Sequence, residues 1–390
     1  MDKPQLIDDP ASLEKGLNRL AQTEWFAIDT EFIREETYWP RLCLVQVATP
    51  DFIACIDPLA LDDLGGLFAL MQDPGITKVF HAAGQDLEIF HHLTGKVPAP
   101  VFDTQVAAPL LGHPEQAGFA RLVSGLLGVE LEKGHQRTDW SRRPLPADAL
   151  AYAADDVRYL VPLCQQIHTE LAARGRLEWL EPEFARLTDP ARYDPPAADA
   201  WQRVKGGERL PDRGRATLQA LAEWRENTAR EQDVPRGRIA RDDVLVDIAR
   251  TQPKSRDQLG RMRSVRGSLI DRHGDRLLEL VKESRQTKPP LSAKRGRQVT
   301  LGAAGEALAD ALSAIIRLRA EEVDLNPASL ASRKDLARIA SGEAAHDVLA
   351  GWRSGLVADQ LDALARGRSV LRVEQGRLAV FEAEANRAPM

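Results

Sequence analysis

The stretch from Glu24 to Phe32, EWFAIDTEF, constrains the fold of this chain more than any other. It has the apolar and aromatic composition of a buried strand, but it carries the acids Asp29 and Glu31 near its end. Because side chains alternate along a strand, both carboxylates lie on one face. Two neighbouring anions at a partly buried place need a compensating cation, and a divalent metal with oxygen ligands is the usual one. The alternative is a strand that runs out into a solvated acidic turn.

Composition limits the classes of protein that remain. A chain of 390 residues with 43% hydrophobic content predicts two or three domains. With 52 basic and 58 acidic residues, the net charge of −6 excludes a protein that coats nucleic acid over its whole surface, although a local basic surface stays open. Cys43, Cys55 and Cys164 are isolated in apolar segments, which favours buried thiols over zinc ligands or disulfides. Without a membrane-length apolar run or a signal segment, we expect a cytoplasmic protein.

The first half of the chain has the pattern of an α/β domain. Antiparallel strands come first, and helices and strands then alternate, which predicts a mixed sheet covered by helices with ligands near the carboxyl ends of strands. The predicted elements are strands over 24–32, 42–49 and 52–57, a helix over 59–71, a strand over 78–81, a helix over 86–93, a strand over 101–104 and a helix over 105–111.

Further acids follow at suitable places. Asp86, in HAAGQDLEIF, falls in the first turn of a predicted helix, where it is either a ligand or an ordinary helix-start residue. Asp103 ends a strand and could cap the next helix in the same way. In YAADDVRYL, helical spacing places Asp156 on the inward stripe of Tyr152, and Asp155 on a more polar one. A register error would exchange Asp155 and Asp156.

Three motifs together carry a family resemblance. DTEF at 29–32, HAAGQDLEIF at 81–90 and YAADDVRYL at 152–160 resemble the exonuclease motifs of the DEDD superfamily, in the subgroup whose third motif is Y-x-x-x-D. The intervening pieces TYWPRLCLVQVA, FDTQ and RTDWSRRPL are similar to the ribonuclease D family of 3′-5′ exoribonucleases, and the similarity covers essentially the whole chain. The resemblance implies a ribonuclease H-like mixed sheet with helices on both faces.

The resemblance also implies a set of site residues. The metal ligands would be Asp29, Glu31, Asp86 and Asp156, and Tyr152 would stand beside the attacking water. Two divalent ions suit phosphodiester hydrolysis, since one activates water and the other stabilises the departing oxygen. An oxygen-only ligand set favours Mg²⁺ or Mn²⁺ over zinc.

Weaker candidates lie between the motifs. Gln46, on a predicted buried strand, either braces a ligand or is a satisfied core amide. His81 is a candidate substrate contact, with a core histidine as the alternative. A cationic loop before the last motif could hold RNA phosphates, and Trp140 within it is expected to be a packing anchor. The cations of this loop are Lys133, Arg137, Arg142 and Arg143.

The remaining chain is expected to be helical and weakly repetitive. Proline-rich stretches near 188–200 and 286–298 indicate linkers. Between and after them, apolar residues recur at a constant offset of 91, as in the pairs Ile239 and Leu330, Leu245 and Leu336, and Ile248 and Ile339. The arrangement resembles the two all-α HRDC-type domains that follow the catalytic domain in the ribonuclease D family, the second being more divergent. The predicted domains are 1–192, 193–290 and 291–390.

The resemblance implies an enzyme that trims the 3′ ends of tRNA precursors and other small structured RNAs. It would release nucleoside 5′-monophosphates and act as a monomer without a membrane partner. The helical domains would bind RNA, chiefly through the arginine-rich first one, and the second could pack back on the catalytic domain to form a ring that admits a single-stranded 3′ tail. A related 3′-5′ DNA exonuclease and a non-catalytic RNA-binding scaffold are the alternatives.

Overall fold

The computed structural model describes residues 4–131, 134, 138–287 and 300–383. Its first part is built on a six-stranded mixed sheet in the order β1-β4-β3-β2-β5-β6. The predicted antiparallel meander is confirmed, with β2 (Trp25–Ile33) paired to β3 (Arg41–Thr49) and β3 paired to β4 (Phe52–Ile56). The parallel strands are β1 (Gln5–Ile7) beside β4, β5 (Thr77–Phe80) beside β2, and β6 (Val101–Asp103) beside β5. The edge strand β1 was not predicted.

Helices cover both faces of this sheet. On one face, Phe26 and Ile28 of β2 share a core with residues of α1 (Pro10–Leu20), α2 (Gly65–Met71) and α3 (Gly84–Thr94). On the other face, Ala27 shares a core with α5 (Phe119–Leu127) and α6 (Ala147–Ala173). The alternation predicted for β2 is thereby confirmed. Short helices α4 (Thr104–Ala107) and η1 (Ala108–Leu111) follow β6, and η2 (Leu177–Leu180), α7 (Glu181–Leu187) and η3 (Pro190–Arg192) follow α6.

One predicted helix begins later than expected. The pattern over 59–71 predicts a continuous helix, but α2 starts only at Gly65. Asp57 Oδ1 accepts a hydrogen bond from the Leu59 backbone N–H at 2.9 Å, and Asp63 Oδ1 accepts one from that of Gly65 at 2.7 Å. Side-chain acceptors of this kind compete with helical hydrogen bonds, so the segment before Gly65 turns instead.

The first helical domain packs around α8 (Asp212–Glu231). It comprises η4 (Ala197–Arg203), η5 (Gly207–Arg209), α8, α9 (Arg236–Ile239), α10 (Asp242–Thr251), α11 (Arg256–Gly260) and α12 (Gly267–Ser284). Trp201 of η4 and Leu221 of α8 belong to its core. The end of the stretch 188–200, predicted as linker, therefore belongs to a 3₁₀ helix that packs on this domain.

The second helical domain repeats the start of the first. Its helices are α13 (Ala303–Glu322), α14 (Pro327–Leu330), α15 (Arg333–Ala340), α16 (Ala345–Val348) and α17 (Trp352–Ala365). The first three begin 91 residues after α8, α9 and α10 respectively, which confirms the repeat seen in the sequence. A hairpin of β7 (Ser369–Glu374) and β8 (Arg377–Glu382), which the expectation of helices alone did not include, follows α17. Gln375 and Gly376 form its turn with φ of 50° and 79°, as a two-residue hairpin loop requires.

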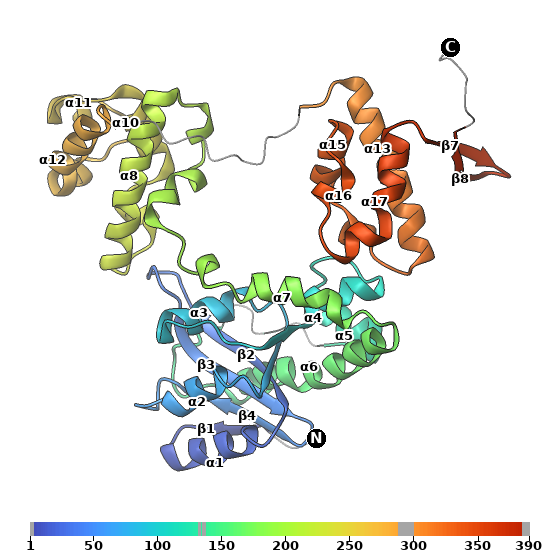
Figure 1. Ribbon diagram of the computed structural model, residues 1–390. Helices are drawn as coiled ribbons and strands as arrows, with labels where there is room; N and C mark the ends of the chain where they lie inside the picture. Colours follow the sequence, from blue (N-terminus) through green and yellow to red (C-terminus); the bar gives the residue numbers. More distant parts are fainter. Residues whose placement is uncertain (1–3, 132–133, 135–137, 288–299, 384–390) are drawn as a thin grey trace.

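Both helical domains contact the α/β domain, and they stand apart on the same side of it (Figure 1). The first meets the loop after β2, where the Tyr38 hydroxyl donates to Glu226 at 2.5 Å. The second packs against η1 and η2, where Trp179 stacks on Trp352 with centroids 4.6 Å apart. Among the described helices, none combines the length and apolar character needed to cross a membrane.

Candidate active site

Two of the predicted ligands lie in the second half of β2, after its buried apolar residues. Asp29 and Glu31 are both partly exposed, whereas Thr30 between them is buried. Asp29 stands opposite Gln46 on β3, and Glu31 stands opposite Leu44. The register shifts directly after Glu31, so a bulge separates the acidic pair from Phe32. Such irregularities are common beside active sites because they redirect side chains.

The third predicted ligand comes from α3. Asp86 lies in the first turn of this helix, where an acid is favoured by the helix dipole, and it is only 6% exposed. The Thr30 hydroxyl donates to Asp86 Oδ1 at 2.5 Å, which connects the helix to β2. The turn before α3 is held by Asp103, whose carboxylate accepts hydrogen bonds from the backbone N–H groups of Ala82 and Ala83. Asp103 also accepts from the Gln105 N–H, which confirms its expected capping role.

The long helix α6 supplies the remaining pair. Small residues such as Ala149, Ala153 and Ala154 are buried against β3 and β4, so the helix approaches the sheet closely. Tyr152 and Asp156 then come within electrostatic range of Asp29 on β2. Asp155 is 38% exposed and forms an ion pair with Arg158 on the same helix.

Electrostatics show that these side chains form one group. Burial, with repulsion from Asp29, Asp156 and Asp86, raises the pKa of Glu31 to about 9. Burial also raises the pKa of Asp29 to about 6, and burial with repulsion from Asp29 and Asp155 raises that of Asp156 to about 8. The pKa of Asp86 is raised in the same direction by burial and by Asp29. Burial and the neighbouring carboxylates raise the pKa of Tyr152 to about 12, so its hydroxyl stays protonated.

This donor set fits a divalent cation. Carboxylates that repel each other in a low-polarity site are stabilised by a positive ion, and the absence of sulfur and nitrogen donors suits Mg²⁺ or Mn²⁺. As they stand, no three His, Cys, Asp or Glu side chains in the described ranges form a group that could hold a metal. The Thr30 hydroxyl bonds one oxygen of Asp86 and leaves its other carboxylate oxygen open to further partners.

Gln46 proves to be an unsatisfied core amide. It is fully buried, and neither its Oε1 nor its Nε2 has a hydrogen-bond partner among the described residues. A buried amide of this kind costs free energy unless something pairs with it. Gln46 stands opposite Asp29 in the pairing of β2 with β3, and its full burial leaves no exposed surface for a direct contact with RNA.

His81 has the surroundings of a packed histidine. Its Nδ1 lies 3.0 Å from Thr104 Oγ1, and its ring lies 5.4 Å from that of Phe119 between centroids. Burial lowers its pKa, so the neutral ring is favoured. These contacts favour the interpretation of His81 as a core histidine over its interpretation as a substrate contact.

The residues of the cationic loop have different surroundings in the structure. Arg143 does not present a free charge for phosphate: its guanidinium donates to both oxygens of Asp57, at 2.5 and 2.6 Å, and to the carbonyl of Cys43. It therefore clamps the loop to the sheet, which corrects the expected phosphate contact. Trp140 is buried, as predicted for a packing anchor. Arg142 is exposed, and Lys133 and Arg137 lie outside the described residues.

Sequence reasoning missed two supporting contacts. Thr30, the middle residue of the D-T-E motif, bonds Asp86. Alternation along the strand places Thr30 on the face opposite Asp29 and Glu31, so the sequence pattern did not mark it as part of the site. Arg34 forms two hydrogen bonds of 2.8 Å with Glu88, which ties the end of β2 to α3. A cation three residues after Glu31 and an acid two residues after Asp86 are visible in the sequence, but their pairing requires the fold.

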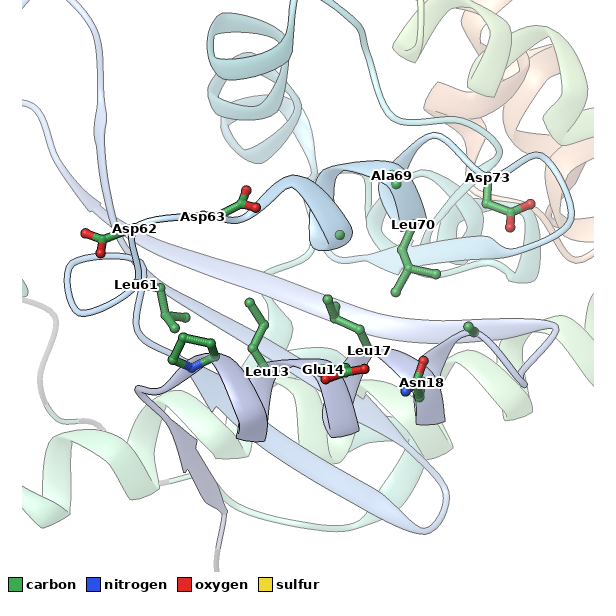
Figure 2. Close-up of a pocket in the computed structure, with 13 residues that line it drawn as sticks. Leu13, Glu14, Leu17, Asn18, Leu61, Asp62, Asp63, Ala69, Leu70 and Asp73 are labelled. Carbon is green, nitrogen blue, oxygen red and sulfur yellow. The ribbon is translucent and has the colours of Figure 1, made fainter.

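A separate hollow of about 540 Å³ lies between α1 and α2 (Figure 2). Leu13, Leu17, Leu61 and Leu70 form its apolar part, and acids including Glu14 and Asp62 stand at its edge. None of the predicted site residues lines it. The candidate active site therefore rests on the carboxylate group at the end of β2.

Comparisons with known proteins agree with this geometry. Residues 4–172 match a family model described as 3'-5' exonuclease, and residues 215–281 match the HRDC domain model. The chain is 40% identical to ribonuclease D of Zymomonas mobilis over 381 residues, which covers 96% of this chain and 97% of that protein. It is also 40% identical to ribonuclease D of Sphingobium indicum over 379 residues, which covers 96% of this chain and 97% of that one.

A solved structure supports the same family assignment. The crystal structure of Escherichia coli RNase D, described as an exoribonuclease involved in structured RNA processing, superposes with a TM-score of 0.79 at 32% identity and covers 94% of this chain and 99% of that chain. The predicted α/β catalytic fold followed by helical domains is thereby confirmed. The chain belongs to the ribonuclease D family of 3′-5′ exoribonucleases.

Proposed function

We propose that the protein trims the 3′ ends of tRNA precursors and other small structured RNAs, in the cytoplasm and as a monomer. The single observation that carries the hydrolytic part is the group formed by Asp29, Glu31, Asp86 and Asp156, whose carboxylates raise one another's pKa around Tyr152. The substrates would be RNAs with a single-stranded 3′ end. The Escherichia coli relative, which acts in structured RNA processing, supports this choice.

In this proposal the four carboxylates hold two Mg²⁺ or Mn²⁺ ions. When bound, such a pair supplies Lewis acidity for activating water and for stabilising charge on the departing oxygen. Asp29 lies centrally, since it affects the charge state of Glu31, Asp86 and Asp156. Gln46 would donate its Nε2 hydrogens to Asp29 and keep that carboxylate oriented.

Tyr152 would position the attacking water. Its hydroxyl remains protonated because its pKa is about 12, so it can hydrogen-bond the water without competing as an anion. The water oxygen forms a bond to phosphorus and the water gives up a proton, while the bond from phosphorus to the 3′ oxygen breaks and that oxygen takes up a proton, so that one water molecule is added overall. The product is a nucleoside 5′-monophosphate and an RNA shorter by one residue.

A time course with matched oligonucleotides tests the proposal. Single-stranded RNA labelled at the 3′ end should release labelled nucleoside 5′-monophosphate at once, and RNA labelled at the 5′ end should give a ladder that shortens stepwise. A DNA oligonucleotide of the same sequence should be cut more slowly. Faster cleavage of DNA would favour the related DNA exonuclease, and an absence of cleavage with Mg²⁺ or Mn²⁺ would favour the scaffold.

A further inference from the structure

Asp103 uses both oxygens of its carboxylate, although capping α4 requires only one of them. It ends β6, stands opposite Phe80 at the end of β5, and is only 2% exposed. Its Oδ1 accepts hydrogen bonds from the backbone N–H of Gln105 at 2.8 Å, which caps α4, and from that of Ala82 at 3.0 Å. Its Oδ2 accepts from that of Ala83 at 2.9 Å. An asparagine or a serine would cap α4 about as well, so the cap does not explain the second oxygen.

The turn that makes these two further bonds has an unfavourable backbone conformation. Ala82 has a φ of 64°, in the left-handed region that residues other than glycine rarely occupy. Such a conformation persists only where the surrounding structure fixes it. The carboxylate of Asp103 does so, because it accepts hydrogen bonds from the successive N–H groups of Ala82 and Ala83.

Thr104 holds the two residues before this turn. It is fully buried, and its hydroxyl donates to the carbonyl of Phe80 at 3.1 Å. Because a hydroxyl has a single hydrogen, its oxygen is left to accept from the Nδ1–H of His81, at 3.0 Å. The four residues from Phe80 to Ala83 are therefore all bonded to the side chain of Asp103 or of Thr104.

The position of this turn decides where Asp86 lies. Helix α3 begins at Gly84, directly after Ala83, and Asp86 is its third residue. Residues within one helical turn keep a fixed geometry, so a shift of the residues before α3 moves the Asp86 carboxylate as well. The Thr30 hydroxyl bonds Asp86 from β2 at 2.5 Å, but it holds only the side chain. The backbone that carries Asp86 is held from the end of β6.

We propose that Asp103 is a positioning residue for RNA hydrolysis, which acts on Asp86 through the backbone of the turn before α3. The assignment rests on the proposed function, in which Asp86 binds a divalent ion. Groups of this kind have to be held within about 0.5 Å of their productive positions. Asp103 is itself unsuited to bind the ion, because both of its oxygens accept backbone hydrogen bonds. The alternative is that Asp103 does no more than cap α4.

The variant Asp103→Asn separates these two roles. Its Oδ1 can still accept from Gln105 and Ala82, so the cap of α4 is kept. Its Nδ2 hydrogens would face the N–H of Ala83, and because two donors repel each other the turn should shift. We expect the affinity for Mn²⁺ to fall about tenfold, at the low end of what is lost when a support of a metal ligand is removed. The KM for single-stranded RNA at saturating Mg²⁺ should stay near wild type.

Two measurements on the full-length protein check these expectations. Calorimetric titration with Mn²⁺, after removal of metal with EDTA and dialysis, gives the affinity for the ion without any hydrolysis. Initial rates on single-stranded RNA give the KM and the Mg²⁺ concentration for half-maximal rate, which should rise by a factor similar to the loss of Mn²⁺ affinity. Loss of affinity for RNA with unchanged affinity for Mn²⁺ would overturn the proposal.

A second variant, Thr104→Val, distinguishes position from charge. Asp103→Asn also removes a negative charge near the carboxylate group, and this loss alone would weaken cation binding. Thr104→Val keeps the charge and nearly the same shape, but it releases Phe80 and His81 from the hydroxyl. Its affinity for Mn²⁺ should therefore fall too, by a smaller factor. Wild-type affinity in Thr104→Val beside a fall in Asp103→Asn would overturn the proposal in favour of a charge effect.

The matched control is Asp362→Asn in the second helical domain. Asp362 is 6% exposed, and its Oδ1 accepts a hydrogen bond from the backbone N–H of Ala345, the first residue of α16, at 2.9 Å. This variant should lower the thermal midpoint but leave the affinity for Mn²⁺ unchanged. Equal affinities in Asp103→Asn and Asp362→Asn would show that capping is the whole role of Asp103. If Asp103→Asn does not fold, Thr104→Val decides by the same criterion.

The wild-type protein tests the proposed function separately. If it hydrolyses RNA only with a divalent ion, and both turn variants bind Mn²⁺ as wild type does, the positioning role alone is overturned. If wild type neither binds Mn²⁺ nor hydrolyses RNA, the proposed function is overturned together with this inference.

Discussion

At the scale of single residues, neighbouring side chains of the same type have different roles because the fold places them differently. Asp155 and Asp156 are adjacent on α6, but Asp155 pairs with Arg158 whereas Asp156 interacts with Asp29. Tyr152, one turn before Asp156 on α6, interacts electrostatically with Asp156 and Asp29. These differences can be tested one side chain at a time.

The first prediction compares Asp156→Asn with Asp155→Asn. The first change should lower turnover by several orders of magnitude, because a two-metal site fails when either ion is misplaced, and the second should be nearly silent. Steady-state hydrolysis of single-stranded RNA measures both, with circular dichroism to verify folding. An inactive Asp155→Asn beside an active Asp156→Asn would show that the register proposed for the last motif is wrong.

The second prediction concerns the Tyr152 hydroxyl. Tyr152→Phe keeps the ring in place but removes the group proposed to orient water, so metal and RNA affinity should stay near wild type while the chemical step slows strongly. Single-turnover rates with metal and RNA saturating separate the two effects. If those rates match wild type, other groups hold the water.

The third prediction follows from the raised carboxylate pKa values. In the folded protein without metal, the pKa values of Asp29, Asp156 and Glu31 are about 6, 8 and 9. These values lie above those of the unfolded chain, so the folded state binds more protons than the unfolded state as the pH approaches them. Their contribution to stability is complete at low pH and is lost as pH rises through this window. In EDTA the thermal midpoint should therefore fall between about pH 5 and 9, and Mn²⁺ should restore it.

Calorimetry provides the control for that prediction. Divalent ions must displace these protons, so the heat of Mn²⁺ binding at neutral pH should depend on the ionisation enthalpy of the buffer. The double variant Asp29→Asn/Asp156→Asn should lose most of this dependence. A buffer-independent heat for wild type would contradict the raised pKa values.

At the scale of elements, the site depends on how α3 is held against β2. Asp86 and Glu88 lie two residues apart near the start of α3, and Asp86 is bonded to Thr30 whereas Glu88 is bonded to Arg34. The guanidinium of Arg34 also donates to the carbonyl of Tyr38 at 3.1 Å. The strand end, the helix and the following loop are thus joined by a partly buried cation.

The fourth prediction is that Glu88→Gln loosens this connection. The two-pronged pair with Arg34 is partly shielded, so its loss should cost about 1 to 2 kcal/mol of unfolding free energy. Because α3 carries Asp86, metal affinity and turnover should fall several-fold as well. Chemical denaturation and metal titration measure these effects, with Arg19→Gln, which removes an exposed pair with Asp51, as the matched control. Equal effects in the two variants would assign Glu88 no positioning role.

At the scale of the whole molecule, the first helical domain is joined to the catalytic domain through a buried charged cluster. Glu226 accepts hydrogen bonds from the Tyr38 hydroxyl at 2.5 Å and from Arg236 at 2.5 and 2.7 Å. Asp233 accepts two more from the backbone N–H groups of Tyr38 and Trp39. Although burial opposes ionisation, the hydrogen bonds from Arg236 and Tyr38 lower the pKa of Glu226 to about 2.

The fifth prediction is that Glu226→Gln uncouples this domain. Removing one partner of a buried charged cluster costs about 3 kcal/mol or more, so the variant should unfold in two steps at neutral pH. Because the pKa is depressed on folding, the stabilisation is present above the ordinary value near 4.5 and is lost as pH falls toward 2. Scanning calorimetry should show the gap between wild type and variant closing over that window. Glu223→Gln changes an acid on the same helix that forms no hydrogen bond with the cluster among the described residues, and it should behave like wild type throughout.

The sequence by itself determined the order of the main strands and helices in the α/β domain and which acids share a face, because both depend on local periodicity, whereas the complete set of four carboxylates came from the resemblance to the DEDD motifs. Alternation along β2 places Asp29 and Glu31 on one face, and helical spacing in α6 places Asp156 with Tyr152. The constant offset of 91 residues predicted the repeated helical domains for the same reason. Local patterns also failed where side chains compete with the backbone, as at the late start of α2.

Only the tertiary structure decided which partners the polar side chains find. Arg143 clamps Asp57, 86 residues earlier in the chain, and Gln46 is left unsatisfied opposite Asp29. The cluster around Glu226 likewise joins segments that are far apart in sequence. The energy of a charge or an amide depends on its burial and on its nearest partner, and neither quantity has a period along the chain.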